Sequence, residues 1–270
     1  MLKRLIVMLW LLTTALTARA GATPQYTDVY FIPAESGWGV FVVQTNTFQF
    51  LAFFIYDKNG NPTWYTAHLY DDGTGNYTGA LYATTGTYFA QAWNPAQLTA
   101  NQVGTATFAP ISNYQATLTY TANGVGPVVK TIQRQTLTPE VLSGNYSGTL
   151  SGSISGCANP ANNVASFNDR FNLTVTQAVD NSSATFIFTV VASNEKPVNA
   201  VCTLTGAITQ GGLLYSMPNA SYSCPLSPAT AAIINNFRVT GQGIEGRWHA
   251  NDGGGCTESV HFSAVDLSLD

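Results

Sequence analysis

The stretch FQFLAFFIY at residues 48–56, followed by DKNGNP at 57–62 and TWYTAHLY at 63–70, decides the fold class of this chain. Its two flanking runs are rich in aromatic and β-branched residues, which favour strands. Between them, Asn59-Gly60 supplies the positive backbone angle that a tight hairpin turn requires. The stretch therefore predicts two antiparallel strands joined by a short turn.

Residues 48–56 are apolar at nearly every position, so the usual alternation of a half-exposed strand is missing. One face of this strand can fill the interior of a barrel. The other face then needs a partner surface, which could be the second domain, a second sheet or another protomer. Self-association through Phe48–Tyr56 is therefore one of the expected partnerships.

Strand-like runs separated by turn residues continue through the rest of the chain. A meander of this kind must close or stack to hide its edges, so we predict an all-β protein with two antiparallel meander domains, each a barrel or a sandwich. One short helix is expected at 228–237, with Ser227 as its cap and Pro228 at its first position. The strands are expected at 38–43, 48–56, 63–70, 77–83, 104–108, 114–120, 128–134, 144–153, 167–177, 184–192, 200–209, 213–224, 237–249 and 257–265.

The composition excludes several classes of protein. Of the 270 residues, 45% are hydrophobic and only 9% are charged, and 14 acids against 10 bases leave a net charge of −4. Helix faces are usually rich in charged residues, so a helical protein is not expected. The chain has no basic stripe to neutralise phosphates, so nucleic acid is not an expected partner.

The first 20 residues predict a cleaved signal peptide. Lys3 and Arg4 form a positive start, an apolar run spans 5–16, and Ala18 and Ala20 are the small residues that signal peptidase needs. The apolar run is too short to cross a bilayer, which takes about 20 residues, and no later run predicts a transmembrane helix. We therefore expect a secreted, periplasmic or cell-surface protein.

Two domains of different composition follow the signal peptide. From Tyr26 to Trp93 there are 18 aromatic residues in 68 positions, whereas 140–270 hold ten in 131. All four cysteines lie after residue 150. We expect a cysteine-free domain at 21–138 and a disulfide-stapled domain at 139–270. The heptapeptide GNYTGAL at 75–81 recurs as GNYSGTL at 144–150, which fits either duplication or convergent strand chemistry.

Four cysteines in an exported chain should pair, and they allow three connectivities. We favour Cys202–Cys224, across two neighbouring strands, with Cys157–Cys256 joining the first and last segments of the domain. The cysteines lie 22 or more residues apart and contain no C-x-x-C pair, so no metal site and no cofactor are expected.

The ionisable residues that follow Gly243 form the strongest candidate for a binding or catalytic cluster. Strand alternation places Glu245, Arg247 and His249 on one face, and the hairpin through 253–255 is expected to bring Glu258 roughly opposite His249. Such a cluster can act as a general base, a ligand clamp or a weak metal site, or it can be a solvated face with ion pairs. His261 is expected on the other strand face from Glu258.

Aromatic residues of the first domain form a second group of binding candidates, namely Trp38, Trp64 and Tyr65. Exposed Tyr and Trp rings stack on sugars and line apolar cavities. The alternative is that these large rings fill the core of a domain without disulfides.

Several motifs carry a resemblance to a known group of proteins. The segments ESGWG at 35–39, YDKNGNPTW at 56–64 and YTGALY at 77–82 resemble a module of secreted proteobacterial β-rich proteins. The second half looks like the four-cysteine partner of that module, through CTLTG at 202–206 and GIEGRW at 243–248. The resemblance implies export and a two-part β architecture, and it brings no activity or catalytic residue with it.

The sequence contains no G-x-S-x-G, H-E-x-x-H or P-loop motif. We therefore expect an exported, non-enzymatic module that binds a small molecule, a glycan or an envelope protein. One alternative is a hydrolase of an envelope polymer or glycan that uses Glu245, His249 and Glu258. A second alternative is an outer-membrane β-barrel, although Asp270 stands where such barrels usually end in an aromatic residue.

Overall fold

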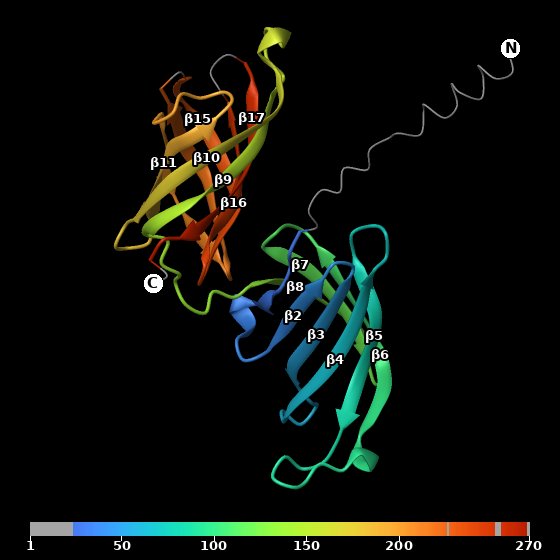
Figure 1. The fold of residues 1–270 in the computed structure, drawn as a ribbon. Coiled ribbons are helices and arrows are strands. Elements are labelled where there is room, and N and C mark those ends of the chain that lie inside the picture. Colours follow the sequence, from blue (N-terminus) through green and yellow to red (C-terminus); the bar gives the residue numbers. More distant parts are fainter. Residues whose placement is uncertain (1–23, 226, 252–254, 269–270) are drawn as a thin grey trace, which may run out of the picture.

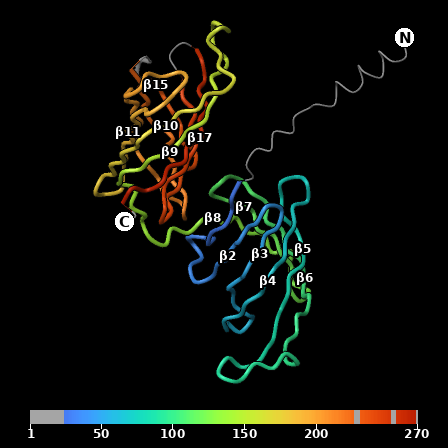
Figure 2. The backbone as a smooth tube through the Cα atoms, in the orientation of Figure 1, coloured from blue at the N-terminus to red at the C-terminus, as the bar shows by residue number. Residues whose placement is uncertain are grey.

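The computed structural model describes residues 24–225, 227–251 and 255–268. The predicted signal peptide at 1–20 lies outside these residues. Figure 1 shows two separate β-barrels joined by a short connection, and the smooth trace in Figure 2 shows the same meander of strands in each. The predicted all-β fold with antiparallel meander barrels is confirmed.

Eight antiparallel strands close the first barrel, and each pairs with its neighbour in sequence before the last pairs with the first. The sequence does not predict the strand from Asp28 to Phe31, because this strand is only four residues long. The strands are β1 (Asp28–Phe31), β2 (Gly39–Thr45), β3 (Phe48–Tyr56), β4 (Pro62–Asp71), β5 (Tyr77–Thr85), β6 (Thr99–Pro110), β7 (Gln115–Ala122) and β8 (Val125–Arg134).

The second barrel repeats this topology among the residues described, with the β12–β14 and β9–β17 pairings closing it. A three-residue strand, β13 (Thr209–Gly211), extends from β14. The barrel strands are β9 (Gly144–Ser155), β10 (Val164–Gln177), β11 (Ser183–Ser193), β12 (Val201–Ala207), β14 (Leu214–Cys224), β15 (Ser227–Thr240), β16 (Gly243–Asn251) and β17 (Thr257–Asp266). Short 3-10 turns occur at η1 (Pro33–Glu35), η2 (Pro95–Gln97) and η3 (Pro160–Asn162).

The helix expected at 228–237 is wrong, because this segment belongs to β15. Ladders to β14 on one side and β16 on the other satisfy its backbone, and this tertiary pairing overrides the local helix signals of Ser227 and Pro228. The single strand expected at 237–249 is also wrong, because the chain turns between Thr240 and Gly243.

The two barrels share a hydrogen-bond arrangement where the chain enters the first strand. The Tyr30 hydroxyl in β1 donates to the Tyr26 carbonyl at 3.1 Å, and the Tyr146 hydroxyl in β9 donates to the Leu142 carbonyl at 2.9 Å. Both tyrosines are 1% exposed, so each closes the end of its barrel without leaving a buried hydroxyl unpaired.

A glutamine at the end of the second strand completes the arrangement. The side-chain oxygen of Gln44 accepts from the Tyr26 amide, and that of Gln177 accepts from the Leu142 amide. The backbone amides of the two glutamines donate in turn to Thr27 Oγ1 and Ser143 Oγ. These contacts relate the barrels strand by strand, first to first and second to second.

The repeated heptapeptide does not follow this strand-by-strand correspondence between the two barrels. Its first copy enters β5, the fifth strand of one barrel, while its second copy begins β9, the first strand of the other. The two copies therefore occupy different places in the two barrels, as convergent strand chemistry predicts. The equivalent tyrosines, Tyr30 and Tyr146, lie in segments with little other likeness.

Both favoured disulfides are present, and they tie the end of the second barrel that lies away from the first. Cys157–Cys256 links the segment after β9 to the segment before β17, and Cys202–Cys224 joins the paired strands β12 and β14. Disulfides of this kind are typical of an oxidising, extracellular or periplasmic compartment. Within the described residues, no helix is long and apolar enough to cross a membrane.

Removing the disulfides one at a time should destabilise the second barrel to different degrees. Cys157 and Cys256 are 99 residues apart and Cys202 and Cys224 are 22 apart. In the loop-closure model the first pair contributes about 4.7 kcal/mol and the second about 3.4 kcal/mol. Urea unfolding of the Cys157→Ser/Cys256→Ser and Cys202→Ser/Cys224→Ser double variants checks this order, and a larger loss from the shorter loop would contradict it.

Candidate functional site

A glycine turn of the second barrel docks onto the first. Gly212, at the tip of the β13–β14 hairpin, has a backbone φ of +61°, which favours glycine. A Cβ atom at this position would lie 2.1 Å from Asp28 Oδ2 and 2.9 Å from Arg134 Cβ. The turn therefore fits against the first barrel only because the residue has no side chain.

A buried ion pair receives this turn. Arg134 Nη1 lies 2.8 Å from Asp28 Oδ2, and the two residues are 3% and 9% exposed. The backbone amide of Leu213, in the second barrel, donates to the same carboxylate oxygen at 2.9 Å. The pair is thus shared by both barrels, with Asp28 as the acceptor that joins them.

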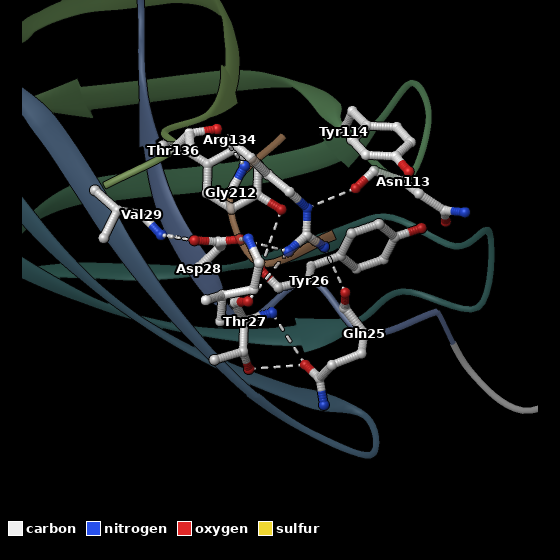
Figure 3. Close-up of polar contacts among 12 residues, drawn as sticks. Gln25, Tyr26, Thr27, Asp28, Val29, Asn113, Tyr114, Arg134, Thr136 and Gly212 are labelled. Atoms are coloured by element: carbon white, nitrogen blue, oxygen red, sulfur yellow. Dashed lines mark hydrogen bonds and ion pairs between the residues drawn. The ribbon is translucent and has the colours of Figure 1, made fainter. Parts of the chain in front are cut away.

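The remaining donors of Arg134 are used within the first barrel (Figure 3). Its Nε donates to the Asn113 carbonyl at 2.6 Å and its Nη2 donates to the Gln25 carbonyl at 2.5 Å, while Nη1 also reaches the Thr27 carbonyl at 3.2 Å. A buried guanidinium with its donors satisfied avoids much of the cost of desolvation. Arg134 therefore fixes the chain before β1 and the β6–β7 loop as one docking surface.

Tyr114 holds the other side of the hairpin. Its hydroxyl lies 2.9 Å from the Tyr215 carbonyl and 2.8 Å from the Asn235 carbonyl, and these two acceptors share its single proton. Its ring lies 2.7 Å from the position that a Cβ on Gly211 would take. Burial raises the pKa of Tyr114 to about 12, so the hydroxyl stays a donor at neutral pH.

A cleft of about 450 Å³ opens beside this junction, and residues of both barrels line it. This volume is within the range of small-molecule sites. Residues 24, 25, 27, 113 and 134 line it from the first barrel, and 213, 214, 235–238, 245–247, 249 and 261 from the second.

The cluster predicted on β16 lies in this cleft. Glu245, Arg247 and His249 point outward from the same face of the strand, as the alternation predicts, and all three line the cleft. Arg247 is paired in register with Asn236 on β15 and with His261 on β17. Residues paired in this way are near neighbours, so Arg247 has an asparagine and a histidine as its cross-strand neighbours.

The charged groups of the cleft differ in how they are paired. Glu245 accepts from Arg238 Nε at 2.5 Å, and His249 Nδ1 lies 3.0 Å from Ser259 Oγ. Arg247 is exposed and takes part in none of the ion pairs found among the described residues. The cleft therefore presents an exposed cation that lies outside these ion pairs.

Glu258 is not where the sequence predicts it. The β16–β17 register pairs His249 with Ser259 and Ala250 with Glu258, so Glu258 faces the barrel interior and is 6% exposed. The expectation is wrong by one residue in the hairpin, and a shift of one residue moves a side chain to the opposite face of the sheet. His261 does lie on the other face from Glu258, as expected.

Inside the barrel, Glu258 belongs to a second charged group. Lys196 Nζ lies 3.0 Å from Asp169 Oδ2 and 3.8 Å from Glu258 Oε1, and 4.4 Å from the centre of the Phe167 ring. Burial raises the pKa of the Tyr222 hydroxyl, helped by the charge of Glu258 and by a hydrogen bond to it. In this group one ammonium faces two carboxylates, and the group shares no residue with the cleft.

The aromatic candidates of the first barrel have different environments. Trp38 is partly buried at the barrel end, where its Nε1 donates to Glu35 Oε2 at 3.0 Å and Lys130 lies 5.5 Å from its ring. Tyr65 is also partly buried, and its hydroxyl accepts from Asn123 at 3.0 Å. Trp64, in contrast, is 52% exposed on the outer face of β4.

Glu35 explains the unusual ESGWG segment. Its carboxylate lies 2.6 Å from Lys130 Nζ, and the hydrogen bonds from Lys130 and Trp38 lower its pKa. The segment therefore ties the turn before β2 to β8. Trp38 and Tyr65 support the barrel end, and neither lines the cleft between the barrels.

No group of three or more metal-ligating side chains occurs among the described residues. Comparisons with protein-family models and with curated proteins each found no match to this chain.

Sequence reasoning missed the residues that build the cleft from the first barrel. Asp28 and Arg134 are 106 positions apart, and Asp28 and Leu213 are 185 apart. No local pattern links them, because their meeting depends on barrel closure and on docking. Asn236 was missed because its strand was expected to be a helix.

We expect Gly212→Ala to weaken the docking of the two barrels. The positive φ alone costs an alanine about 1–2 kcal/mol, and the contact with Asp28 and Arg134 adds to that cost. Gly124→Ala is the matched control, because Gly124 has φ +78° and its Cβ would meet nothing within 4 Å. In urea unfolding Gly212→Ala should lose clearly more stability than Gly124→Ala, and equal losses would disprove the docking role.

The raised pKa of Tyr114 predicts an alkaline weakness of the junction. A group whose pKa is higher in the folded state contributes stability below its unfolded value, about 10, and loses it as pH rises toward 12. Tyr114→Phe removes this group, so its stability should fall less steeply between those two pH values than that of the unmodified protein. Unfolding curves across that range test this, and parallel pH profiles would contradict it.

Proposed function

We propose that this chain is an exported, non-enzymatic binding protein that holds an anionic small molecule or acidic sugar in the cleft between its barrels. Arg247 is the observation that carries this proposal. It is exposed within a cleft of ligand size, flanked in register by Asn236 and His261. A guanidinium beside amide and imidazole donors suits a carboxylate, sulfate or phosphate.

The distribution of charge supports an anionic ligand. Of the 10 bases, Lys3, Arg4 and Arg19 lie in the predicted signal peptide, which leaves seven for 14 acids. Three of those seven, Arg134, Arg238 and Arg247, line the cleft, and the lining includes a single acid, Glu245. Arg134 is paired with Asp28 and Arg238 with Glu245, so Arg247 supplies the net positive charge of the cleft, which guides anions toward it on an otherwise acidic protein.

Binding accounts for this arrangement better than hydrolysis. The hydrolase alternative needs Glu245, His249 and Glu258 together, and Glu258 points into the barrel. The carboxylate that remains, Glu245, is engaged by Arg238. His249 is therefore left without the second carboxylate that acid–base catalysis was expected to use.

Two features support the proposed export. The two disulfides fit such a compartment, and the charged, apolar and small-residue order of positions 1–20 is typical of a secretory signal. A ligand met outside the cytoplasm would be an envelope or environmental metabolite, and acidic sugars are one such class.

Replacing Arg247 should abolish most of the binding. Titration calorimetry of the processed protein with oligogalacturonate, inorganic phosphate and a neutral oligosaccharide measures it, and we expect an anion to bind and the neutral sugar not to bind. Arg247→Ala should lower the affinity for the anion about 10- to 100-fold, which is the contribution expected of one hydrogen bond to a charged group. Arg170→Ala is the matched control, because Arg170 is exposed on β10 outside the cleft.

Two results would overturn the proposal. One is equal loss of affinity in Arg247→Ala and Arg170→Ala, which would indicate nonspecific attraction to positive charge. The other is the absence of binding across a broader panel of carboxylated, sulfated and phosphorylated probes.

A further inference from the structure

The outer face of β2–β5 in the first barrel carries a continuous aromatic surface. Figure 1 shows these four strands side by side. The register places Phe54 opposite Trp64, Phe50 opposite His68 and Phe48 opposite Tyr70. We call this surface the aromatic face, and its residues are Phe41, Val43, Phe48, Phe50, Phe54, Trp64, His68, Tyr70 and Tyr82.

Neither barrel of the chain covers this face. Phe41, Val43, Phe54, Trp64 and Tyr70 are each between 45% and 59% exposed. At about 200 Å² per side chain these five expose roughly 500 Å², and the exposed His68 with the partly buried Phe48, Phe50 and Tyr82 bring the total to roughly 700 Å². Monomeric proteins rarely expose an apolar patch larger than about 300–600 Å².

The rings of the aromatic face already pack on one another. Ring centres lie 5.1 Å apart for Phe41 and Phe54, 5.3 Å for Phe48 and Tyr70, and 5.4 Å for His68 and Tyr82. Rings held in this way lose little conformational freedom when a partner covers them. The face is therefore a preformed surface on a closed barrel.

We infer that the aromatic face binds a second copy of this chain in a two-fold symmetric dimer. Its area is close to the roughly 800 Å² that each partner buries in a standard interface. A closed barrel offers no free strand edge, so association has to occur face to face, as in packed sheets. The second copy would cover the outer face of residues 48–56, which no other described part of the same chain covers.

The charge pattern favours an identical partner. Lys, Arg, Asp and Glu are absent from the outward positions of β2, β3 and β4 between Gly39 and Tyr70. In a two-fold interface each face meets its own copy, so any charge near the axis would meet a like charge. A face without charge avoids that repulsion and resembles the apolar interfaces of homodimers.

Sedimentation velocity of the processed full chain from about 1 to 100 µM tests this inference, because interfaces of standard size are commonly stable in that range. We expect a dimer that Val43→Glu weakens at least 100-fold by placing two carboxylates in the interface. Val129→Glu is the matched control: Val129 is 60% exposed on β8 and lies outside the aromatic face, so its dimer should be unchanged. Thermal unfolding of both variants is the check that each is folded.

Three outcomes would overturn the inference. The unmodified chain could remain monomeric throughout, both variants could dimerise equally well, or a monomer could adsorb to an insoluble polysaccharide through the aromatic face. The last result would identify a polymer as the occupant. Arg247→Ala should leave the dimer intact, so failure of the ligand proposal and failure of this one give different results.

Discussion

The buried pair of Asp28 and Arg134 is the interaction on which the arrangement of the two barrels depends. It lies inside the first barrel's end, yet one carboxylate oxygen also accepts from Leu213 of the second barrel. Removing either charge would leave the other buried and unpaired, which is costly in a protein interior. The pair thus links closure of the first barrel to docking of the second, and the cleft opens beside this junction.

The three chemically distinctive regions of the molecule are separated in space. The cleft holds the exposed cation Arg247, the interior of the second barrel holds the paired Asp169, Lys196 and Glu258, and the aromatic face has no such charge. A low overall charge makes this separation informative. With only 9% charged residues, a position that holds an unpaired arginine is unlike most of the surface.

The strand pattern and the disulfides could be predicted from the sequence because they depend on local alternation and on few cysteines. Glu245, Arg247 and His249 share a face for the same reason, since a strand has a period of two. The face of Glu258 could not be read in this way, because it depends on the register across a glycine-rich hairpin. Likewise, β15 has local helix signals, and only its two neighbouring strands decide its conformation.

We propose that ligand binds in the cleft between the barrels. Backbone amide chemical-shift mapping by NMR, during titration with an anion that binds, tests it most directly. Shifts are expected to gather on β15–β17 around Arg247 and also at Gln25 and Asn113, across the cleft on the other barrel. Shifts confined to the aromatic face, or to the interior group around Lys196, would contradict it.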